Sequence, residues 1–413
     1  MEMAAAAPSS WEDLPPDLLG LVLLRLPSLV DRVHLRAVCR PWRAGAHAKR
    51  QPVLPPPLPW LAFRDGGLVD LHGARVRCAP ILREGVDFGY LVVDNLAFLV
   101  HNDGACSVMN PLSGSTLPLP KLAPAVRCAL DESEFYNQSY IRKTHEKVIL
   151  SSPLDSTLDP LVATLIMEGN GIAVSTCKQH DAITISLGPD PDCPRVLLKI
   201  EDIAFLHGKL YALTPKEGLH VIELDAGRLS ELKSSSGFLQ CIAEDPKQQQ
   251  IYSYRAGTGP AYVMRYLAES NGRLLMMRRW MSYLQNARLG DHNRNDRTVR
   301  FEVFMADLTT LPGRWTKVDS LDGQAIFLGS ECSQSVLASQ CAGGVQKDCI
   351  YYMDRVFDYN PSKEYFGPCV DPLGNSGVYN MRDGEITPLL PEATMTELRH
   401  KRQFATWFFP ADA

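Results

Sequence analysis

The sequence predicts a small N-terminal all-α module followed by an all-β domain with the repetition of a β-propeller. Three observations predict this order. Apolar residues recur at helical spacing before residue 50, a cluster of prolines follows, and short apolar runs separated by Gly, Asp and Asn fill the chain from about Leu68 onward. We therefore expect helix to be concentrated before residue 50 and strand beyond residue 60.

Three short helices are expected within residues 10–50. Pro15 and Pro16 suit the first turn of a helix, Pro27 ends it, Ser28 offers an N-cap for a second helix, and Pro41 interrupts the chain before a third. The apolar stripe of the first helix consists of Leu18, Leu19, Val22, Leu23 and Leu26. Helices this short cannot bury such a surface among themselves, so the module requires a partner surface.

A proline-rich linker is expected at residues 51–66. Five prolines lie there, at positions 52, 55, 56, 57 and 59. Proline lacks the backbone donor and favours extended backbone, so the segment is expected to act as a stiff spacer. The expected organisation is a helical module at 10–50, the linker at 51–66 and a β-propeller-like domain at 67–410.

The β-domain repeats a unit of three strands joined by two turns. One unit runs over 90–109, a second over 203–224, a third over 325–353, and a partial one begins at Gly377. Small sheets of this kind pack face to face in a propeller, which leaves few strand edges open. The repeats are too degenerate to give the number of blades. Residues 281–299 are polar and lack periodicity, which predicts a long exposed loop.

Composition and charge exclude several classes of protein. The net charge of −5 speaks against sequence-independent nucleic-acid binding, and no apolar run is long enough to span a membrane. The first residues lack the basic segment and the apolar core of a secretory signal. The 11 cysteines are odd in number and form no C-x-x-C pair. These features favour reduced thiols in a cytoplasmic or nuclear protein.

The sequence contains no recognisable set of catalytic or metal-ligating residues. The 10 histidines are dispersed without a metal-binding spacing, and no P-loop, dinucleotide fingerprint or nucleophile elbow occurs. We interpret His207 and His220 as turn and surface residues, and Asp94, Asp103 and Asp383 as turn residues. We therefore expect no catalytic residue, no bound metal and no other cofactor.

One small basic and apolar cluster lies at residues 273–280. Its cations are Arg273, Arg278 and Arg279, and its apolar members are Met276, Met277 and Trp280. A strand edge with solvated arginines is the favoured interpretation, and a ligand site is the alternative.

The N-terminal landmarks resemble the F-box. Leu14-Pro15 precedes paired aliphatic residues, Arg25-Leu26 follows, and the segment ends in Val38-Cys39-Arg40-Pro41-Trp42-Arg43. All of them stand in the order and at the spacing of that family. The residues that this resemblance implies on the face towards a Skp-type adaptor are Leu14, Pro15, Leu18, Leu19, Val22 and Leu23. Those implied to hold the module together and complete the interface are Val38, Cys39 and Trp42.

Three motifs beyond the linker resemble the plant F-box proteins that carry a KIB-type β-propeller, a group long catalogued as a domain of unknown function. They are Asn110–Gly114 leading to Leu117–Pro120, Arg314–Val318 followed by Ala325–Gly329, and Thr406–Pro410. These motifs are structural, so the resemblance transfers a fold and not a substrate.

The resemblance implies a non-catalytic substrate-recognition adaptor of a Skp–cullin–F-box ubiquitin ligase. The F-box would dock on the Skp-type adaptor, and through it on cullin, while the β-domain would bind an unidentified protein target. No nucleic acid and no membrane is expected as a partner. Two alternatives stay open: a regulatory binding protein that uses its F-box outside a ligase, and an enzyme with a site in the propeller channel.

Overall fold

The computed structural model describes the chain from Trp11 to Ala411 with gaps. The residues that it describes are 11–26, 28–46, 54, 56–63, 66–71, 73–76, 90–101, 105–119, 147–152, 161–166, 171–176, 183–190, 193–224, 238–245, 247, 253–255, 258–282, 297–329, 331–341, 345–353, 358–360, 365–367, 373, 376–400 and 405–411.

The N-terminal module is helical, as predicted. Its elements are the 3-10 helix η1 (Trp11–Asp13) and the helices α1 (Pro16–Leu24), α2 (Leu29–Ala37) and α3 (Arg40–Ala46). Pro16 occupies the first turn of α1, where its missing N–H costs no hydrogen bond. Ser28 stands at the N-cap of α2 with extended backbone, although its side chain makes no capping hydrogen bond. Pro41 lies inside the first turn of α3 and does not delay that helix.

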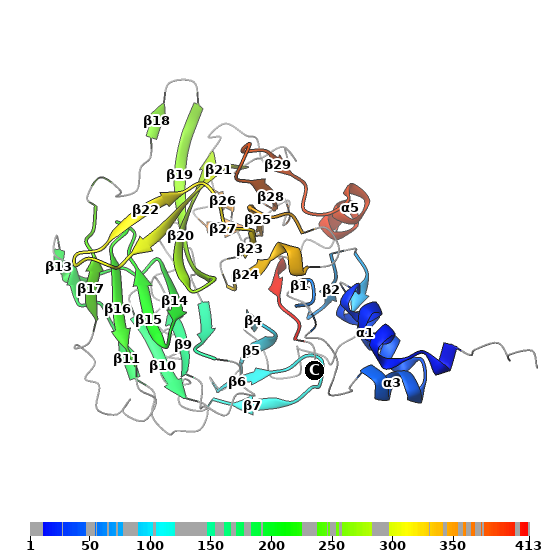
Figure 1. The fold of residues 1–413 in the computed structure, drawn as a ribbon. Helices are drawn as coiled ribbons and strands as arrows, with labels where there is room; N and C mark the ends of the chain where they lie inside the picture. Colours follow the sequence, from blue (N-terminus) through cyan, green and yellow to red (C-terminus); the bar gives the residue numbers. More distant parts are fainter. Residues whose placement is uncertain are drawn as a thin grey trace, which may run out of the picture.

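The rest of the described chain forms a β-propeller of six blades, which confirms the predicted fold class (Figure 1). Blade one contains β1 (Trp60–Phe63), β2 (Leu68–Val69), β3 (Arg75–Val76) and β30 (Ala405–Phe408). Blade two contains β4 (Tyr90–Val93), β5 (Leu96–Val100), β6 (Cys106–Met109) and β7 (Thr116–Pro118). Blade three contains β8 (Lys147–Leu150), β9 (Leu161–Ile166), β10 (Gly171–Thr176) and β11 (Ile183–Ile185).

Of the remaining three blades, blade four has four strands, and blades five and six have five strands each. Blade four contains β14 (Asp202–Leu206), β15 (Lys209–Leu213), β16 (Leu219–Glu223) and β17 (Leu239–Ile242). Blade five contains β18 (Ser253–Arg255), β19 (Thr258–Ser270), β20 (Arg273–Ser282), β21 (Arg297–Asp307) and β22 (Arg314–Val318). Blade six contains β23 (Gln324–Leu328), β24 (Gln334–Leu337), β25 (Cys349–Tyr352), β28 (Gly377–Asn380) and β29 (Ile386–Thr387).

A few elements lie outside the blades. They are the hairpin of β12 (Pro189–Asp190) and β13 (Cys193–Leu197), the hairpin of β26 (Asp358–Asn360) and β27 (Tyr365–Gly367), the 3-10 helix η4 (Ala338–Gln340), and the helix α5 (Glu392–His400). The sequence did not predict α5, because helix was expected to be concentrated before residue 50. Its Met395 and Leu398 pack into the core of blades one and six, so tertiary burial stabilises it.

Many strand predictions are confirmed, because tight turns rich in Asp, Asn and Gly mark the ends of these strands. Tyr90–Val93 and Leu96–Val100 are strands as expected, and Asp94 between them has a φ of 51°. The Asn110 turn joins β6 to β7: the Asn110 side chain accepts the Leu112 N–H at 2.9 Å. Residues 281–299 are not all loop, because β20 reaches Ser282 and β21 begins at Arg297; residues 283–296 lie outside the described residues.

Blade six departs from the expected sequence of antiparallel strands. The third and the partial repeat form one sheet in the order β24-β23-β25-β28-β29, and β25 pairs with β23 in parallel. β24 instead occupies the edge of the sheet nearest β19. The prediction of two separate units was therefore wrong for this blade.

The ring is closed by strands from its two ends. β30 pairs with β1 over four residues, and Trp60 stacks on Phe408 with ring centroids 5.7 Å apart. β1 lies within residues 51–66, so part of the range expected as linker belongs to blade one. The propeller begins at Trp60 at the latest.

Apolar side chains between neighbouring blades form the core. Each apolar cluster of the propeller joins two adjacent sheets. One cluster contains Phe327 of blade six and Trp407 of blade one, whose rings pack edge to face with centroids 5.0 Å apart. Trp407 is fully buried and its indole N–H donates to the Leu328 carbonyl at 3.0 Å. Strands of this kind read as continuous apolar runs because both faces of each sheet are covered.

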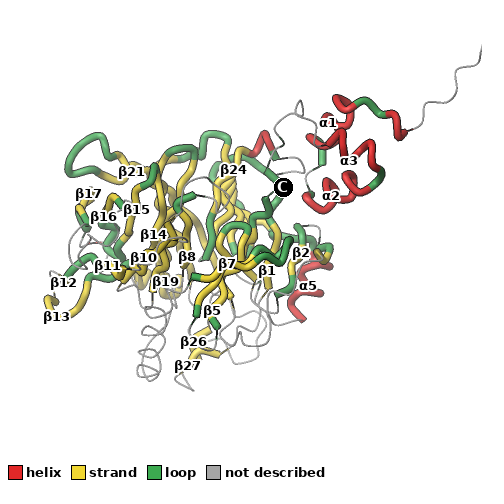
Figure 2. The backbone as a smooth tube through the Cα atoms, turned by 90° about the horizontal axis from the view of Figure 1, so that it is seen from below, coloured by secondary structure: helices red, strands yellow, loops and turns green. Residues whose placement is uncertain are grey.

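The helical module contacts blade one directly. Leu29, the first residue of α2, is buried in a cluster with Trp60, Leu68 and Phe408 of the propeller. Figure 2 shows α1, α2 and α3 together at one edge of the strand-rich body. The helical module is thus joined to the propeller by an apolar contact as well as by the proline-containing segment.

Candidate functional site

The outer surface of the N-terminal helices carries an unusual number of exposed apolar side chains. We call these residues the helical face: Trp11, Leu18, Leu21, Val22, Val33 and Val38. Their exposed fractions range from 40% for Val22 to 78% for Trp11. A concentration of this kind on so small a unit is typical of a protein–protein interaction surface.

The nine residues predicted for adaptor docking fall into three groups. Those exposed are Pro15, Leu18, Val22 and Val38. Those half-buried are Leu14, Cys39 and Trp42. Those buried are Leu19 and Leu23. The first group can meet a partner as the chain stands, so their docking role stays a prediction.

Leu19 and Leu23 do not face outward, which corrects the predicted face. They form the centre of the module with Leu35 and Ala46, at exposures of 1% and 0%. Gly45 of α3 permits this packing, because a Cβ there would lie 3.1 Å from Leu19 Cδ2. Leu21 and Val33, which were not among the predicted docking residues, lie on the exposed side instead.

Trp42 stabilises the module from within, as predicted. Its indole N–H donates to the Trp11 carbonyl at 2.8 Å and its ring packs against the buried leucines. Val38, expected to help hold the module together, is 63% exposed and does not contribute to that core.

The arginines at 273–280 are not solvated residues of a strand edge. They lie on β20, which is the central strand of the five in blade five. Arg279 is buried, donates to the Thr298 hydroxyl at 2.8 Å, and stands 4.7 Å above the Tyr352 ring. Arg273 alone pairs near the surface, with Asp322.

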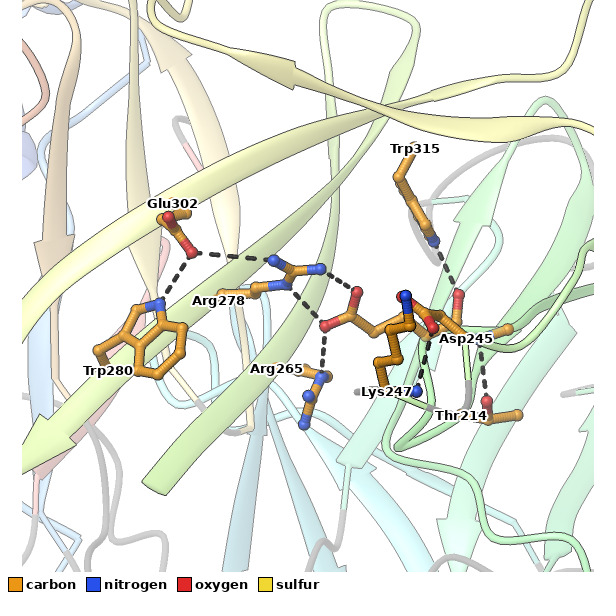
Figure 3. A network of polar contacts seen from close by, with 10 residues as sticks. Thr214, Asp245, Lys247, Arg265, Arg278, Trp280, Glu302 and Trp315 are labelled. Carbon is orange, nitrogen blue, oxygen red and sulfur yellow. Dashed lines mark hydrogen bonds and ion pairs between the residues drawn. The ribbon is translucent and has the colours of Figure 1, made fainter. Parts of the chain in front are cut away.

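Arg278 and Arg265 converge on one carboxylate, that of Glu217 (Figure 3). Glu217 lies in the turn between β15 and β16 of blade four and has a φ of 63°. Its backbone carbonyl accepts the Trp315 indole N–H at 2.8 Å, so a residue of the predicted family motif joins the network. This buried group of contacts connects blade four to blade five, and a structural role accounts for it.

The histidine interpretation is half right. His207 lies exposed in the turn between β14 and β15, as predicted. His220 is instead buried within β16, where burial lowers its pKa to about 4. Asp94 and Asp383 lie in turns as predicted, and Asp103 lies outside the described residues.

The described part of the chain has neither a cluster of metal-ligating residues nor a membrane-spanning helix. No group of three or more His, Cys, Asp or Glu residues there stands close enough to hold a metal ion. No helix there has the length and apolarity to cross a membrane.

Solved structures resemble the chain only distantly. The β-propeller domain of Cps50 (Swd1) from Myceliophteria thermophila is 10% identical with a TM-score of 0.31, over 78% of this chain and 80% of that one. YCF48 from Cyanidioschyzon merolae is 13% identical with a TM-score of 0.27, over 61% of this chain and 78% of that one. Scores this low carry no argument about function.

Sequence comparison is more informative. A curated Arabidopsis thaliana protein, whose name describes it as an F-box/kelch-repeat protein, is 22% identical over 388 residues, which cover 90% of this chain and 94% of that protein. The family model of the KIB1-4 β-propeller matches residues 75–380. That range contains blades two to five entirely and most of blade six. The chain therefore belongs to the KIB1-4 β-propeller family.

Proposed function

We propose that this chain is the substrate-recognition subunit of a Skp–cullin–F-box ubiquitin ligase. The helical face docks on a Skp-type adaptor, and the propeller binds a protein target. The chain itself carries no chemistry: it brings lysines of the target near a charged ubiquitin-conjugating enzyme, which raises their effective concentration.

One observation carries the proposal. Six large apolar side chains are exposed on a module of three short helices whose own core is already filled by Leu19, Leu23, Leu35 and Ala46. The module therefore folds with a surplus of apolar surface, and a partner groove is the environment that such a surface fits. The F-box landmarks of the sequence and the F-box/kelch-repeat name of the relative support a Skp-type adaptor as that partner.

The test is capture of a purified Skp-type adaptor by Leu18→Ala with Val22→Ala. Both residues are on the helical face, so their truncation removes interface contacts without opening a cavity in the module. Truncating interface anchors of this kind costs about 1–2 kcal/mol each, so we expect the double change to lower adaptor affinity by roughly 30-fold to 1,000-fold.

The matched control is Leu239→Ala with Leu311→Ala, two exposed leucines on blades four and five. It should capture the adaptor as the unchanged chain does. Unchanged capture by the Leu18/Val22 variant would contradict the docking assignment. Adaptor capture without recruitment of cullin in a three-component mixture would favour a binding protein that acts outside a ligase.

A further inference from the structure

One face of blade five passes from buried to exposed along its length. β19, β20 and β21 have 13, 10 and 11 residues, far more than the strands of the other blades. In register on this face, Arg278 lies opposite Glu302, and Trp280 lies opposite Arg300. Met276, one step below, is fully buried against blade four, whereas Arg300 is largely exposed. In Figure 1 the far ends of β18 and β19 stand clear of the neighbouring blades.

Two cations on the exposed part of this face, Arg300 and Lys317, approach a carboxylate without donating a hydrogen bond to it. The Arg300 guanidinium lies 4.8 Å from the centroid of the Trp280 ring, and its Nη2 is 3.8 Å from Glu302 Oε1. Lys317 Nζ lies 3.7 Å from the same oxygen. Both separations exceed a hydrogen bond. Among the residues that the structure describes, neither cation donates a side-chain hydrogen bond, and their side chains are 52% and 56% exposed.

The carboxylates nearby are already engaged. Glu302 Oε2 accepts the Trp280 indole N–H at 2.9 Å and stands 3.8 Å from Arg278 Nη1 (Figure 3). Glu217 is occupied by Arg265 and Arg278. Four cations therefore share two carboxylates, in a chain whose net charge is −5. The cations are Arg265, Arg278, Arg300 and Lys317, and the carboxylates are Glu217 and Glu302. The excess positive charge lies at Arg300 and Lys317, the two most exposed members.

We propose that this face, which we call the Arg300 face, binds an acidic peptide segment of a protein partner. A guanidinium held over an indole ring loses little conformational freedom when it binds a carboxylate, and it offers two parallel N–H donors. A second carboxylate would meet Lys317 on the neighbouring strand. With only two exposed cations here on a chain of negative net charge, the face suits a short acidic segment better than a nucleic acid. This inference rests on the proposed function, because it assigns the target-binding surface of the propeller.

The test is fluorescence anisotropy of the full chain with a fluorescein-labelled peptide of alternating glutamate and serine. We expect it to bind at least tenfold more tightly than the same peptide with glutamine in place of glutamate. Binding should weaken between 50 and 300 mM salt, because the cations are exposed to screening ions. In Arg300→Gln with Lys317→Gln, affinity for the glutamate peptide should fall about tenfold.

The matched control is Arg314→Gln. Arg314 is on the same strand as Lys317, and its substitution removes one positive charge, as each of the two changes in the Arg300/Lys317 variant does. Alternation along β22 places Arg314 on the opposite face of the sheet. Its affinity for the glutamate peptide should stay within twofold of the unchanged chain. Equal losses in the Arg314 variant, full binding by the Arg300/Lys317 variant, or equal binding of the two peptides would each overturn the proposal.

The two proposals fail separately. Peptide binding is measured without the Skp-type adaptor, and adaptor capture is measured without the peptide. Arg300→Gln with Lys317→Gln should capture the adaptor normally, because the helical face lies on other elements. Lost peptide preference with intact adaptor capture would refute the Arg300 face alone. Unchanged adaptor capture by the Leu18/Val22 variant, with the preference for the glutamate peptide intact, would refute the docking assignment alone.

Discussion

The guanidinium of Arg278 donates two hydrogen bonds to the carboxylate of Glu217: Nε donates to Oε1 at 2.6 Å, and Nη2 donates to Oε2. The contact crosses from blade five to blade four, and Arg265 Nε donates to the same carboxylate at 2.8 Å. Glu217 and Arg265 are both buried. Removing the anion therefore leaves cations in a place where water cannot replace it.

Glu217→Gln is expected to destabilise the propeller by about 3 kcal/mol or more, because a buried charge loses its partner. Urea unfolding followed by intrinsic fluorescence measures the change. The comparison is Asp322→Asn, which breaks the exposed ion pair with Arg273 and should cost less than about 1 kcal/mol. Equal losses of unfolding free energy in the two variants would show that the buried ion pair does not stabilise the contact between blades four and five.

His220 should make stability depend on pH below neutrality. Burial lowers its pKa from 6.5 to about 4, so the unfolded chain binds this proton at a higher pH than the folded chain does. The contribution of His220 to stability is then full above about pH 6.5 and is lost as the pH falls towards 4, by roughly 3 kcal/mol. Thermal unfolding at a series of pH values measures this.

The comparison for the pH series is His220→Leu, which cannot titrate. The His220 Nε2 atom has no hydrogen-bond partner among the described residues, so an apolar side chain sacrifices no bond there. The unfolding free energy of the unchanged chain minus that of His220→Leu should fall by roughly 3 kcal/mol between pH 7 and pH 4. A constant difference across that range would mean that His220 is accessible to protons in the folded chain.

Neighbouring residues of α1 should separate stability from binding. Leu23 is fully buried, so Leu23→Ala is expected to cost about 2–5 kcal/mol and to loosen the helical module. Val22→Ala, on the exposed side, should cost less than about 1 kcal/mol while weakening adaptor capture. Hydrogen exchange of α1 reports the first effect and surface plasmon resonance the second. The assignment of the two faces is wrong if Val22→Ala is the more destabilising change.

Leu29 should control how the helical module is held against the propeller. Leu29→Asp places a charge among Trp60, Leu68 and Phe408, which is unfavourable in an apolar contact. We expect the module to separate from blade one, with a larger radius of gyration by small-angle scattering and faster proteolysis in the proline-rich segment. Adaptor capture should persist because Leu29 is not part of the helical face. An unchanged radius of gyration would argue that other contacts suffice.

The sequence predicted strands well where local chemistry determines them, and poorly where distant contacts do. Leu96–Val100 follows a two-residue turn that its own residues specify. The parallel pairing of β25 with β23 has no local signature, because it depends on where β28 arrives. Helix α5 likewise depends on burial against blades one and six.

The candidate site shows the same division. Periodicity predicts that α1 is a helix, but its large apolar residues spread around most of its circumference, so spacing alone cannot distinguish the core from the exposed face. These residues are Leu18, Leu19, Leu21, Val22, Leu23 and Leu24. The arginines of β20 were expected in solvent because charged residues are seldom buried without partners. Their partner, Glu217, is 61 residues from Arg278 along the chain.

Closure of the ring by β1 and β30 imposes an order on synthesis at the ribosome. The helical module leaves the exit tunnel first and has its own buried leucines, whereas blade one stays incomplete until Ala405–Phe408 emerges. Until then the growing chain presents an open strand edge at β1, which other strands can join. A messenger truncated shortly before the codons for Ala405–Phe408 would therefore yield a protein with a finished N-terminal module and an unclosed, aggregation-prone ring.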